Sequence, residues 1–504
     1  MGEAASRFAV LRFSGELSIK ARGTRTHFRR RLLMNLRDAL ASEGLAPRIE
    51  VSHERLYVEL PGDGAGAGES LSLREHALAR VFGISSVSLA VRHAVVDTDD
   101  VVRTGAAIFR ERVRGKRFAV RARRVGERHT VRAERMEVER RLGAALLPFA
   151  AGVDLVAPET TAHVELSSTG TAFFSERSQG PGGLPLGVEG RAVALLSGGF
   201  DSAVAAWQMQ RRGVALDLVF CNLGGASHLR GAARVAKVLA ERWSYGERPA
   251  LHAIDFEPVA AAIRAHTDAR FWQVLLKRTM LRAAEAVARE RRAVAIVTGD
   301  AVGQVSSQTL HNLAVVSAAT ELPILRPLVG ANKDEIIECA RRIGTAELSK
   351  VVGEYCAMVP RRPATRAPKA LVEEQEARLP AGLLEALVAK RSLLDLRSLD
   401  LEALDTPGLA IDRLPPGCVV LDLRPIESFR SEHHPEALHL EFSKALEAYP
   451  HFERGRRYVL CCEFGLLSAH LAERMRRDGF DAWHFSGGQR ALMQAARSAA
   501  RSEA

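Results

Sequence analysis

Cysteine pairs of the kind that bind metals are missing from this chain of 504 residues. It contains six cysteines and no C-x-x-C pair, whereas zinc and iron–sulfur sites commonly rely on such pairs. We therefore assign no residue as a metal ligand. The cysteines are also not expected to form a structural disulfide set, because we expect a cytosolic protein. Each remains a candidate for chemistry or a small buried apolar residue: Cys221, Cys339, Cys356, Cys418, Cys461 and Cys462.

Long apolar runs are missing as well, since none reaches the length needed to span a membrane. The residues that follow Met1 contain no secretory h-region. We therefore expect a cytoplasmic protein without a membrane partner. No internal repeat of fixed period is present, and the length predicts three or more domains.

Acidic residues are outnumbered, with 60 Asp and Glu against 71 Lys and Arg, which gives a net charge of +11. Seven basic residues lie between Lys20 and Arg37 without an acidic one, and nine lie between Arg110 and Arg128. Two such clusters predict a face that binds a polyanion such as nucleic acid. A coding bias toward Arg would explain the total number of basic residues, but it explains less well why they cluster in two segments. The candidate RNA contacts are Arg29, Arg30, Arg31, Arg121, Arg123 and Arg124.

Residue patterning predicts α+β units first and an α/β unit afterwards. Residues 7–13 and 55–60 alternate as strands and 27–42 follow a helical period, and a second α+β unit with a helix near 72–81 follows a glycine-rich joint at 61–68. From residue 191, strands at 193–196, 215–221, 250–255 and 293–298 alternate with helices, which predicts a doubly wound, mostly parallel sheet. A polar stretch from residue 360, helical in part, leads to a small α/β unit near the C-terminus.

The segment 192–203 is the most informative part of the chain. An apolar strand ends in Ser197-Gly198-Gly199-Phe200-Asp201-Ser202, and an Ala-rich helix follows. Two glycines allow the backbone to approach an anion, and the first helical N–H groups point at it. A Walker loop is excluded because no Gly-Lys-Ser/Thr follows at the required spacing. The segment resembles the SGGxDS pyrophosphate loop of ATP pyrophosphatases, which split ATP into AMP and pyrophosphate.

A second chemical signal lies at residues 458–470. A strand ends in Cys462, five residues intervene, and Ser468 opens a helix, so loop N–H groups and the positive helix end would stabilise a thiolate or persulfide. Cys461 lies one residue back, and its side chain should face the opposite side of the strand, in the core. With the strand at 419–427 and the turn at 485–488, the pattern resembles rhodanese-like sulfurtransferase domains. The alternative is a buried structural cysteine in a catalytically inactive fold.

Taken together, these motifs resemble the tRNA 4-uridine sulfurtransferase (4-thiouridine synthetase) family in its form with a C-terminal rhodanese domain. The segments that carry the resemblance are 15–20, 121–126, 197–202, 221–226, 276–278, 298–299, 303–309, 354–356 and 458–470. The implied domains are ferredoxin-like (1–63), THUMP RNA-binding (64–175), ATP pyrophosphatase (176–370), a linker (371–410) and rhodanese-like (411–504). The implied fold class is multidomain, α+β followed by α/β.

The resemblance assigns roles to individual residues of the nucleotide site. Asp201 would orient the loop or Mg²⁺, Lys277 would approach the phosphates and Lys333 would stabilise the leaving pyrophosphate. The remaining ATP-binding candidates are the loop residues and the ends of nearby strands and helices: Leu195, Leu196, Ser197, Gly198, Gly199, Ser202, Phe220, Cys221, Gly299 and Gln308. Read without the resemblance, both lysines are surface charges and Phe220 is a core residue.

The resemblance also implies a reaction and partners. ATP would adenylate O4 of a tRNA uridine, at position 8 in this family, a cysteine desulfurase would load Cys462 with a persulfide, and sulfur would replace AMP at C4. Cys356 would then form a disulfide with Cys462. A further partner implied is the thiamine sulfur-carrier protein. The oligomeric state stays open, a homodimer being one alternative.

Departures and rival interpretations complete the sequence analysis. Phe464 stands where an Arg is common in the active loop of the family, which puts the way a persulfide is held in doubt. One rival function is a different adenylating enzyme of the same loop class. Another is an RNA-binding adaptor with degenerate domains, against which the presence of Asp201, Cys356 and Cys462 argues.

Overall fold

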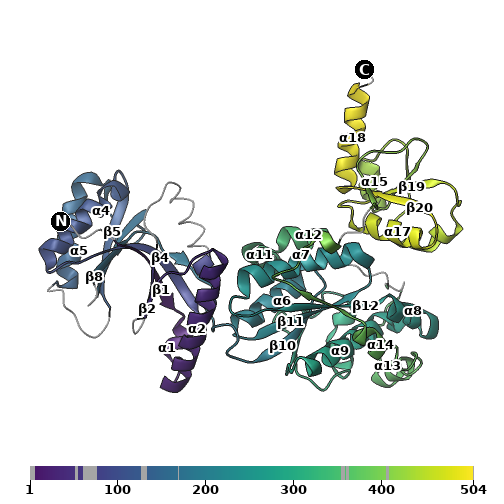
Figure 1. Ribbon diagram of the computed structural model, residues 1–504, viewed down its shortest axis with the longest axis horizontal. Helices are drawn as coiled ribbons and strands as arrows, with labels where there is room; N and C mark the ends of the chain where they lie inside the picture. The colour runs from purple at the N-terminus through teal and green to yellow at the C-terminus, as the bar shows by residue number, and fades with distance from the viewer. Residues whose placement is uncertain are drawn as a thin grey trace. The chain divides into compact units, whose positions relative to one another are not determined.

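The structure is a computed structural model, and it describes residues 6–51, 55–60, 77–125, 133–167, 170–352, 358, 362–404 and 408–502. The chain forms two compact units. The first comprises Met1–Glu189 with Gln210–Val214 and Arg242–Glu247, and the second comprises Gly190–Met209, Ala215–Glu241 and Arg248–Ala504. Across the described part of the chain, no helix has both the length and the apolar character needed to cross a membrane. Figure 1 shows both units and labels many of their elements.

A nine-stranded mixed sheet forms the framework of the first unit. The strand order is β2-β3-β1-β4-β8-β7-β5-β6, and β9 pairs with β4. Every pairing is antiparallel except those that β5 makes with β6 and β7. The bounds are β1 Ser6–Phe13, β2 Ile49–Val51, β3 Arg55–Glu59, β4 Ile84–His93, β5 Arg117–Arg124, β6 Gly152–Val153, β7 Thr160–Ser167, β8 Gly170–Phe174 and β9 Ser178–Gln179.

Helices cover this sheet in two groups, α1 (Gly15–Ser18) with α2 (Arg22–Ser42), and α4 (Thr98–Val113) with α5 (Arg135–Leu146). Helix α2 buries Phe28, Leu32 and Leu36, spaced four residues apart, against the apolar side chains of β1 and β3. The sequence predicts this helix from residue 27, but it begins at Arg22. Its first turn is exposed, so no apolar periodicity marks it.

A buried ionic cluster ties the distant strands β1, β3 and β7 together. Two nitrogens of Arg12 donate to Glu165 at 2.8 and 3.3 Å, and Nε of Arg55 lies 3.6 Å from the other Glu165 oxygen. All three side chains are almost fully buried. Because a buried charge without a partner is costly, this cluster fixes the register of the sheet across both halves of the first unit.

The second unit contains the expected doubly wound sheet, with strand order β14-β13-β10-β11-β12-β15. Its parallel strands are β10 Arg191–Leu195, β11 Ala215–Asn222, β12 Ala250–Asp255, β13 Ile296–Val297 and β14 Ile324–Leu325. Helices α7, α11 and α12 lie on one side of the sheet, and α9, α13 (Lys369–Glu376) and α14 (Leu383–Ala389) lie on the other (Figure 1). The helices are α6 Phe200–Arg211, α7 Gly225–Trp243, α8 Glu257–His266, α9 Trp272–Glu290, α10 Leu310–Ser317, α11 Lys333–Ile343 and α12 Ala346–Val352.

The sequence predicts a linker at 371–410, but in the structure the first part of this segment is folded. It contains most of α13 (Lys369–Glu376), then α14 (Leu383–Ala389) and β15 (Ser392–Asp395). Val372 and Val388 join the apolar core of the sheet, and β15 pairs antiparallel with β12 at its edge. The residues up to 395 therefore belong to the packed layer, because they bury apolar side chains and extend the sheet.

The C-terminal part of the second unit is built on a five-stranded parallel sheet with order β16-β20-β19-β17-β18. Its strands are β16 Ala410–Ile411, β17 Val419–Asp422, β18 Ala437–His439, β19 Arg457–Cys461 and β20 Asp481–Phe485. Its helices are α15 Ile426–Ser431, α16 Phe442–Ala448, α17 Leu466–Arg477 and α18 Gly488–Ser502. A small α/β unit is confirmed here.

Candidate functional site: a nucleotide cavity and a cysteine loop

Hydrogen bonds of the Ser202 hydroxyl fix the shape of the glycine loop after β10. Ser202 Oγ accepts from the backbone N–H of Ser197 at 3.1 Å and donates to the carbonyl of Gly199 at 3.2 Å. Gly198 has φ +84°, and a Cβ there would lie 2.8 Å from Val352. Only glycine meets both conditions, so the chain turns directly from the strand into α6 with its first N–H groups exposed to a ligand.

Two acid–base pairs stand beside this loop, and the first joins Asp201 to Lys333. Nζ of Lys333 lies 2.9 and 3.0 Å from the two carboxylate oxygens. Lys333 is the first residue of α11, whose start is fixed by a capping box between Asn332 and Glu335. The structure therefore brings together two residues that are 132 positions apart and that the sequence analysis singled out separately.

The second pair centres on Asp300, which the sequence analysis did not single out. Its Oδ1 accepts from Lys277 Nζ at 2.7 Å and Gln308 Nε2 at 3.3 Å. Its Oδ2 accepts from Thr298 Oγ1 at 2.8 Å and Arg326 Nε at 3.3 Å. Burial alone would raise the pKa of Asp300, but the charge and hydrogen bond of Lys277, followed by the other donors, lower it below its usual range. Asp300 thus remains ionised and holds Lys277 and Gln308 in place.

A cavity of about 560 Å³ lies above the carboxyl ends of β10, β11 and β13. This is the edge where open α/β sheets bind ligands, and the volume is typical of a small-molecule site. Of the nucleotide-site residues named from the sequence, the structure places all but Gly198, Gly199 and Lys333 in the cavity wall. The residues it brings together are Leu195, Leu196, Ser197, Asp201, Ser202, Phe220, Cys221, Lys277, Gly299 and Gln308.

Both apolar and polar residues line the cavity. The apolar ones include Phe220 and Cys221 near the end of β11 and Leu276 and Met280 of α9. His228 packs edge-to-face on Phe220 with ring centroids 4.8 Å apart, and burial lowers its pKa to about 3. A neutral wall of this kind suits a heteroaromatic base, whereas Lys277 and the glycine loop suit its phosphates.

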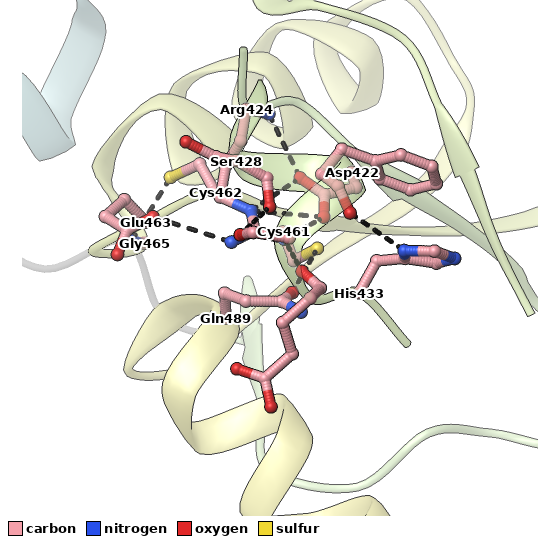
Figure 2. A network of polar contacts seen from close by, with 12 residues as sticks. Asp422, Arg424, Ser428, His433, Cys461, Cys462, Glu463, Gly465 and Gln489 are labelled. Atoms are coloured by element: carbon pink, nitrogen blue, oxygen red, sulfur yellow. Dashed lines mark hydrogen bonds and ion pairs between the residues drawn. The ribbon is translucent and has the colours of Figure 1, made fainter. Parts of the chain in front are cut away.

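Cys462 follows β19 and sits in a cradle of donors at the start of α17, and Figure 2 shows it beside Glu463 and Gly465 of its loop. The backbone N–H groups of Gly465 and Ser468 point at its Sγ from 3.2 and 3.4 Å, and the Ser468 hydroxyl lies 3.4 Å away. Phe464 is 44% exposed at the tip of the same loop. Because N–H donors and a helix N-terminus stabilise negative sulfur, this cradle suits a thiolate or persulfide.

Cys461 faces the other way, as the strand alternation predicts. Its Sγ donates to Gln489 Oε1 at 3.4 Å, and it packs with Val459 and Leu492 in a core separate from that of Cys462 (Figure 2). Burial raises the pKa of the Cys461 thiol. The structure therefore confirms that the two adjacent cysteines have different surroundings, with Cys461 in the core.

The two motifs that flank the cysteine loop in the sequence, at 419–427 and 485–488, both contact it. Arg424 is bonded through Nε and one terminal nitrogen to Asp422 at 2.7–3.1 Å, and its other terminal nitrogen lies 3.6 Å from Glu463 (Figure 2). A Cβ at Gly488 would lie 2.6 Å from the carbonyl oxygen of Cys462. The glycine turn can therefore pack directly against the loop, and the contact between Arg424 and Glu463 adds to the bonds that Cys462 itself accepts from the loop.

The remaining candidates lie elsewhere or outside the described residues. Cys356 falls outside them. Within the first unit, Arg31 donates to the carbonyls of Leu186 and Gly246 at 2.8 and 2.9 Å and pairs with Glu247. Arg29 lies over the ring of Phe13, whereas the other candidates are exposed: Arg30, Arg121, Arg123 and Arg124. Within the described ranges, no group of three or more His, Cys, Asp or Glu side chains could hold a metal ion.

Three family models match the chain. The ThiI ferredoxin-like domain matches residues 9–88, the thiamine biosynthesis protein (ThiI) matches 187–380, and the rhodanese-like domain matches 406–495. The tRNA sulfurtransferase of Pyrobaculum aerophilum is 39% identical over 472 residues, covering 93% of this chain and 94% of that protein. The tRNA sulfurtransferase of Marinobacter nauticus is 36% identical, with 93% and 97% covered.

Among solved structures, a 4-thiouridine synthetase–RNA complex with bound ATP is similar, with a TM-score of 0.66 and 28% identity. The similarity covers 77% of this chain and 99% of that one. PH1313 from Pyrococcus horikoshii shares the fold, with a TM-score of 0.52 and 23% identity. The resemblance stated from the motifs is thus confirmed at the level of the family. Because relatives more than 30% identical match over almost their full length and almost all of this chain, the chain belongs to the tRNA sulfurtransferase family.

Proposed function

We propose that this protein transfers sulfur to tRNA in an ATP-dependent reaction, converting uridine at position 8 to 4-thiouridine. The observation that carries the proposal is the presence, in one chain, of a nucleotide cavity beside an SGGxDS loop and a cysteine cradled by loop N–H groups. The names of the full-length relatives and of the solved RNA complex with ATP support the same reaction.

The uridine would be activated in the cavity. An oxo group is a poor leaving group, and adenylation of O4 converts it to AMP, which leaves readily. The apolar wall beside Phe220 would receive the adenine, and the loop N–H groups with Lys277 would bind phosphate oxygens. Asp201 would hold Mg²⁺ together with those oxygens, since Mg²⁺ is commonly bound by one or two carboxylates and substrate phosphates. Lys333, released from Asp201, would stabilise the departing pyrophosphate.

Sulfur delivery falls to Cys462. A cysteine desulfurase would transfer a sulfur atom to its thiolate, and the N–H groups of Gly465 and Ser468 would stabilise the persulfide. The new C4–S bond forms as the C4–O bond to AMP breaks, with the sulfur delivered directly or as hydrosulfide. In the direct route, the Cys356 thiolate attacks Cys462 Sγ, forming a disulfide as the terminal sulfur leaves on the uridine. A reductant then restores both thiols.

The first unit would bind the tRNA and the C-terminal domain would serve a second acceptor. The exposed Arg30, Arg121, Arg123 and Arg124 are suited to contact phosphates, and Arg121 and Arg124 are each oriented by one bond to a backbone carbonyl of the first unit. Arg31 is less exposed and is bonded to three residues of its own unit. The match to a thiamine biosynthesis family supports a further role, in which the rhodanese-like domain passes sulfur to the thiamine sulfur-carrier protein.

Transfer of labelled sulfur in single-cysteine variants tests the proposal. The full chain is incubated with a cysteine desulfurase and radiolabelled cysteine, then with tRNA and ATP. Cys462→Ala should carry no label, Cys356→Ala should carry label but fail to turn over, and the matched control Cys461→Ala should keep most activity. Label retained on Cys462→Ala but lost from Cys461→Ala would show that the wrong cysteine has been chosen. Tight tRNA binding without pyrophosphate release would favour the RNA-binding adaptor instead.

A further inference from the structure

Arg326 is a charged residue that reaches the nucleotide site from outside the cavity wall. It follows β14, which pairs parallel with β13 so that Leu325 lies opposite Val297. This register places Arg326 beside the segment of Thr298 and Asp300, and its Nε donates to Asp300 Oδ2 at 3.3 Å. Its side chain is 16% exposed and does not line the cavity, whereas Asp300 does. Arg326 therefore meets this site through Asp300.

A second hydrogen bond fixes the guanidinium of Arg326. One of its terminal nitrogens donates to Ser317 Oγ at 2.9 Å, at the last residue of α10. The Ser317 hydroxyl itself donates to the carbonyl of Leu313 at 2.6 Å, so its oxygen is left to accept from Arg326. The guanidinium is thus held between α10 and Asp300, with its Nε–H directed at the carboxylate.

Without Arg326, the charges at the described cavity wall would cancel one another. The wall contains the carboxylates of Asp201 and Asp300 and the ammonium group of Lys277. Lys333 Nζ lies 2.9 and 3.0 Å from the carboxylate oxygens of Asp201, and Lys277 Nζ lies 2.7 Å from Asp300. Each lysine is therefore paired with one aspartate. An ammonium group whose charge is offset in this way attracts a phosphate only weakly.

Arg326 adds one positive charge to this balance. Its guanidinium bonds to one oxygen of Asp300 and Lys277 bonds to the other, so a single carboxylate is shared between two cations. Asp300 is only 8% exposed, and charges interact more strongly in such surroundings than in water. The three groups together keep one positive charge in excess, and Lys277 can still attract an anion that enters the cavity.

We propose that Arg326 is a positioning residue of the nucleotide site. It holds Asp300 in place and offsets its charge, so that Lys277 can attract the phosphates of ATP. This inference rests on the proposed function, which supplies ATP as the ligand. The alternative is that Arg326 only ties β14 to α10, in which case its bond to Ser317 would matter and its charge would not.

Three variants of the full chain separate the two roles. Arg326→Gln removes the charge and Arg326→Lys keeps it, whereas Ser317→Ala breaks the bond to α10 and keeps the contact with Asp300. The Kd for ATP without tRNA, the Kd for tRNA and the melting temperature are measured for each. We expect Arg326→Gln to raise the Kd for ATP about 10-fold, the effect of one charge at short range in partly buried surroundings. Arg326→Lys should raise it by no more than about threefold, because a point charge replaces the guanidinium fork, and Ser317→Ala by no more than about twofold. The Kd for tRNA should be unchanged in all three.

An unchanged Kd for ATP in a folded Arg326→Gln protein would overturn the inference. An equal loss of affinity in Arg326→Lys or in Ser317→Ala would overturn it as well, since both variants keep the charge. If Arg326→Gln does not fold, a rise of about 10-fold in the Kd for ATP of either other variant still contradicts the proposed role. If the unmodified protein does not bind ATP, the proposed function itself fails, and that result is seen before any variant is made.

Discussion

Gly299, two residues after β13, lies so close to the start of α6 that a side chain would not fit between them. A Cβ at this position would lie 2.7 Å from the carbonyl carbon of Asp201, 2.7 Å from the nitrogen of Ser202 and 3.0 Å from the Asp201 oxygen. These are backbone atoms of the first turn of α6, so no side-chain rotation can relieve the clash. Gly299→Ala must therefore move the glycine loop or the strand end that faces it.

The size of the effect follows from the distances. Carbon atoms in ordinary contact are about 3.5 Å apart, so the two segments must separate by roughly 0.8 Å. Overpacking of this kind costs about 1–3 kcal/mol of folding free energy. A displacement near 1 Å of groups that position a reacting phosphate can cost about 100-fold in rate. We therefore expect Gly299→Ala to lose catalysis far more than it loses stability.

The assay compares Gly299→Ala with Gly330→Ala in the full chain. A Cβ at Gly330 meets nothing within 4 Å, so this control should match the unmodified protein in melting temperature and rate. Pyrophosphate release with tRNA and ATP is measured beside thermal unfolding. If Gly299→Ala releases pyrophosphate at the unmodified rate, the close approach of β13 to the loop does not position the phosphates, and the reasoning is wrong.

Three further predictions concern charge and burial. Asp300→Asn should raise the KM for ATP, because Lys277 loses the carboxylate that holds it. The matched control is Asp217→Asn, which removes a buried carboxylate of the same sheet that pairs with two arginines. This control should lower the melting temperature and leave the KM for ATP unchanged. Burial lowers the pKa of the fully buried His252 to about 4 from 6.5. The folded state thus binds fewer protons there than the unfolded state, and the stability that His252 contributes is complete above pH 6.5 and falls by about 2 kcal/mol by pH 5. Urea unfolding at the two pH values should show this loss in the unmodified protein and less of it in His252→Gln; an equal loss in both contradicts it. Arg30→Ala should reduce the salt slope of tRNA binding by about 1 with unchanged stability, whereas Arg31→Ala, which breaks contacts within the first unit, should lower the melting temperature; the reverse pattern would contradict these assignments.

Local motifs of this chain could be predicted from sequence because one short segment carries all of their geometry. Ser197 and Ser202 lie within a single strand–turn–helix, and the alternation that separates Cys461 from Cys462 belongs to one strand. The structure places each of these residues as expected. The assignment of individual ATP- and RNA-binding residues remains a prediction, as does the pairing of Cys356.

Features assembled from distant segments could not be predicted. Asp300 accepts hydrogen bonds from α9, from the segment before α10 and from Arg326. The sequence around β13 contains no pattern that predicts these contacts. The strand β15 was expected as linker because an edge strand carries little burial pattern, with Leu393 59% exposed. The Arg12–Glu165 pair depends on residues 153 positions apart and on the register of the sheet.

Nucleoside analysis of tRNA tests the central claim most directly. The purified chain is incubated with unmodified tRNA, ATP, cysteine, a cysteine desulfurase and a reductant, and the digested tRNA is examined by mass spectrometry for 4-thiouridine. We predict that 4-thiouridine forms at position 8 only when ATP is present. It should be absent with Asp201→Ala, which keeps tRNA binding and persulfide loading but cannot adenylate. Formation of 4-thiouridine without ATP, or its formation by Asp201→Ala, would contradict the account.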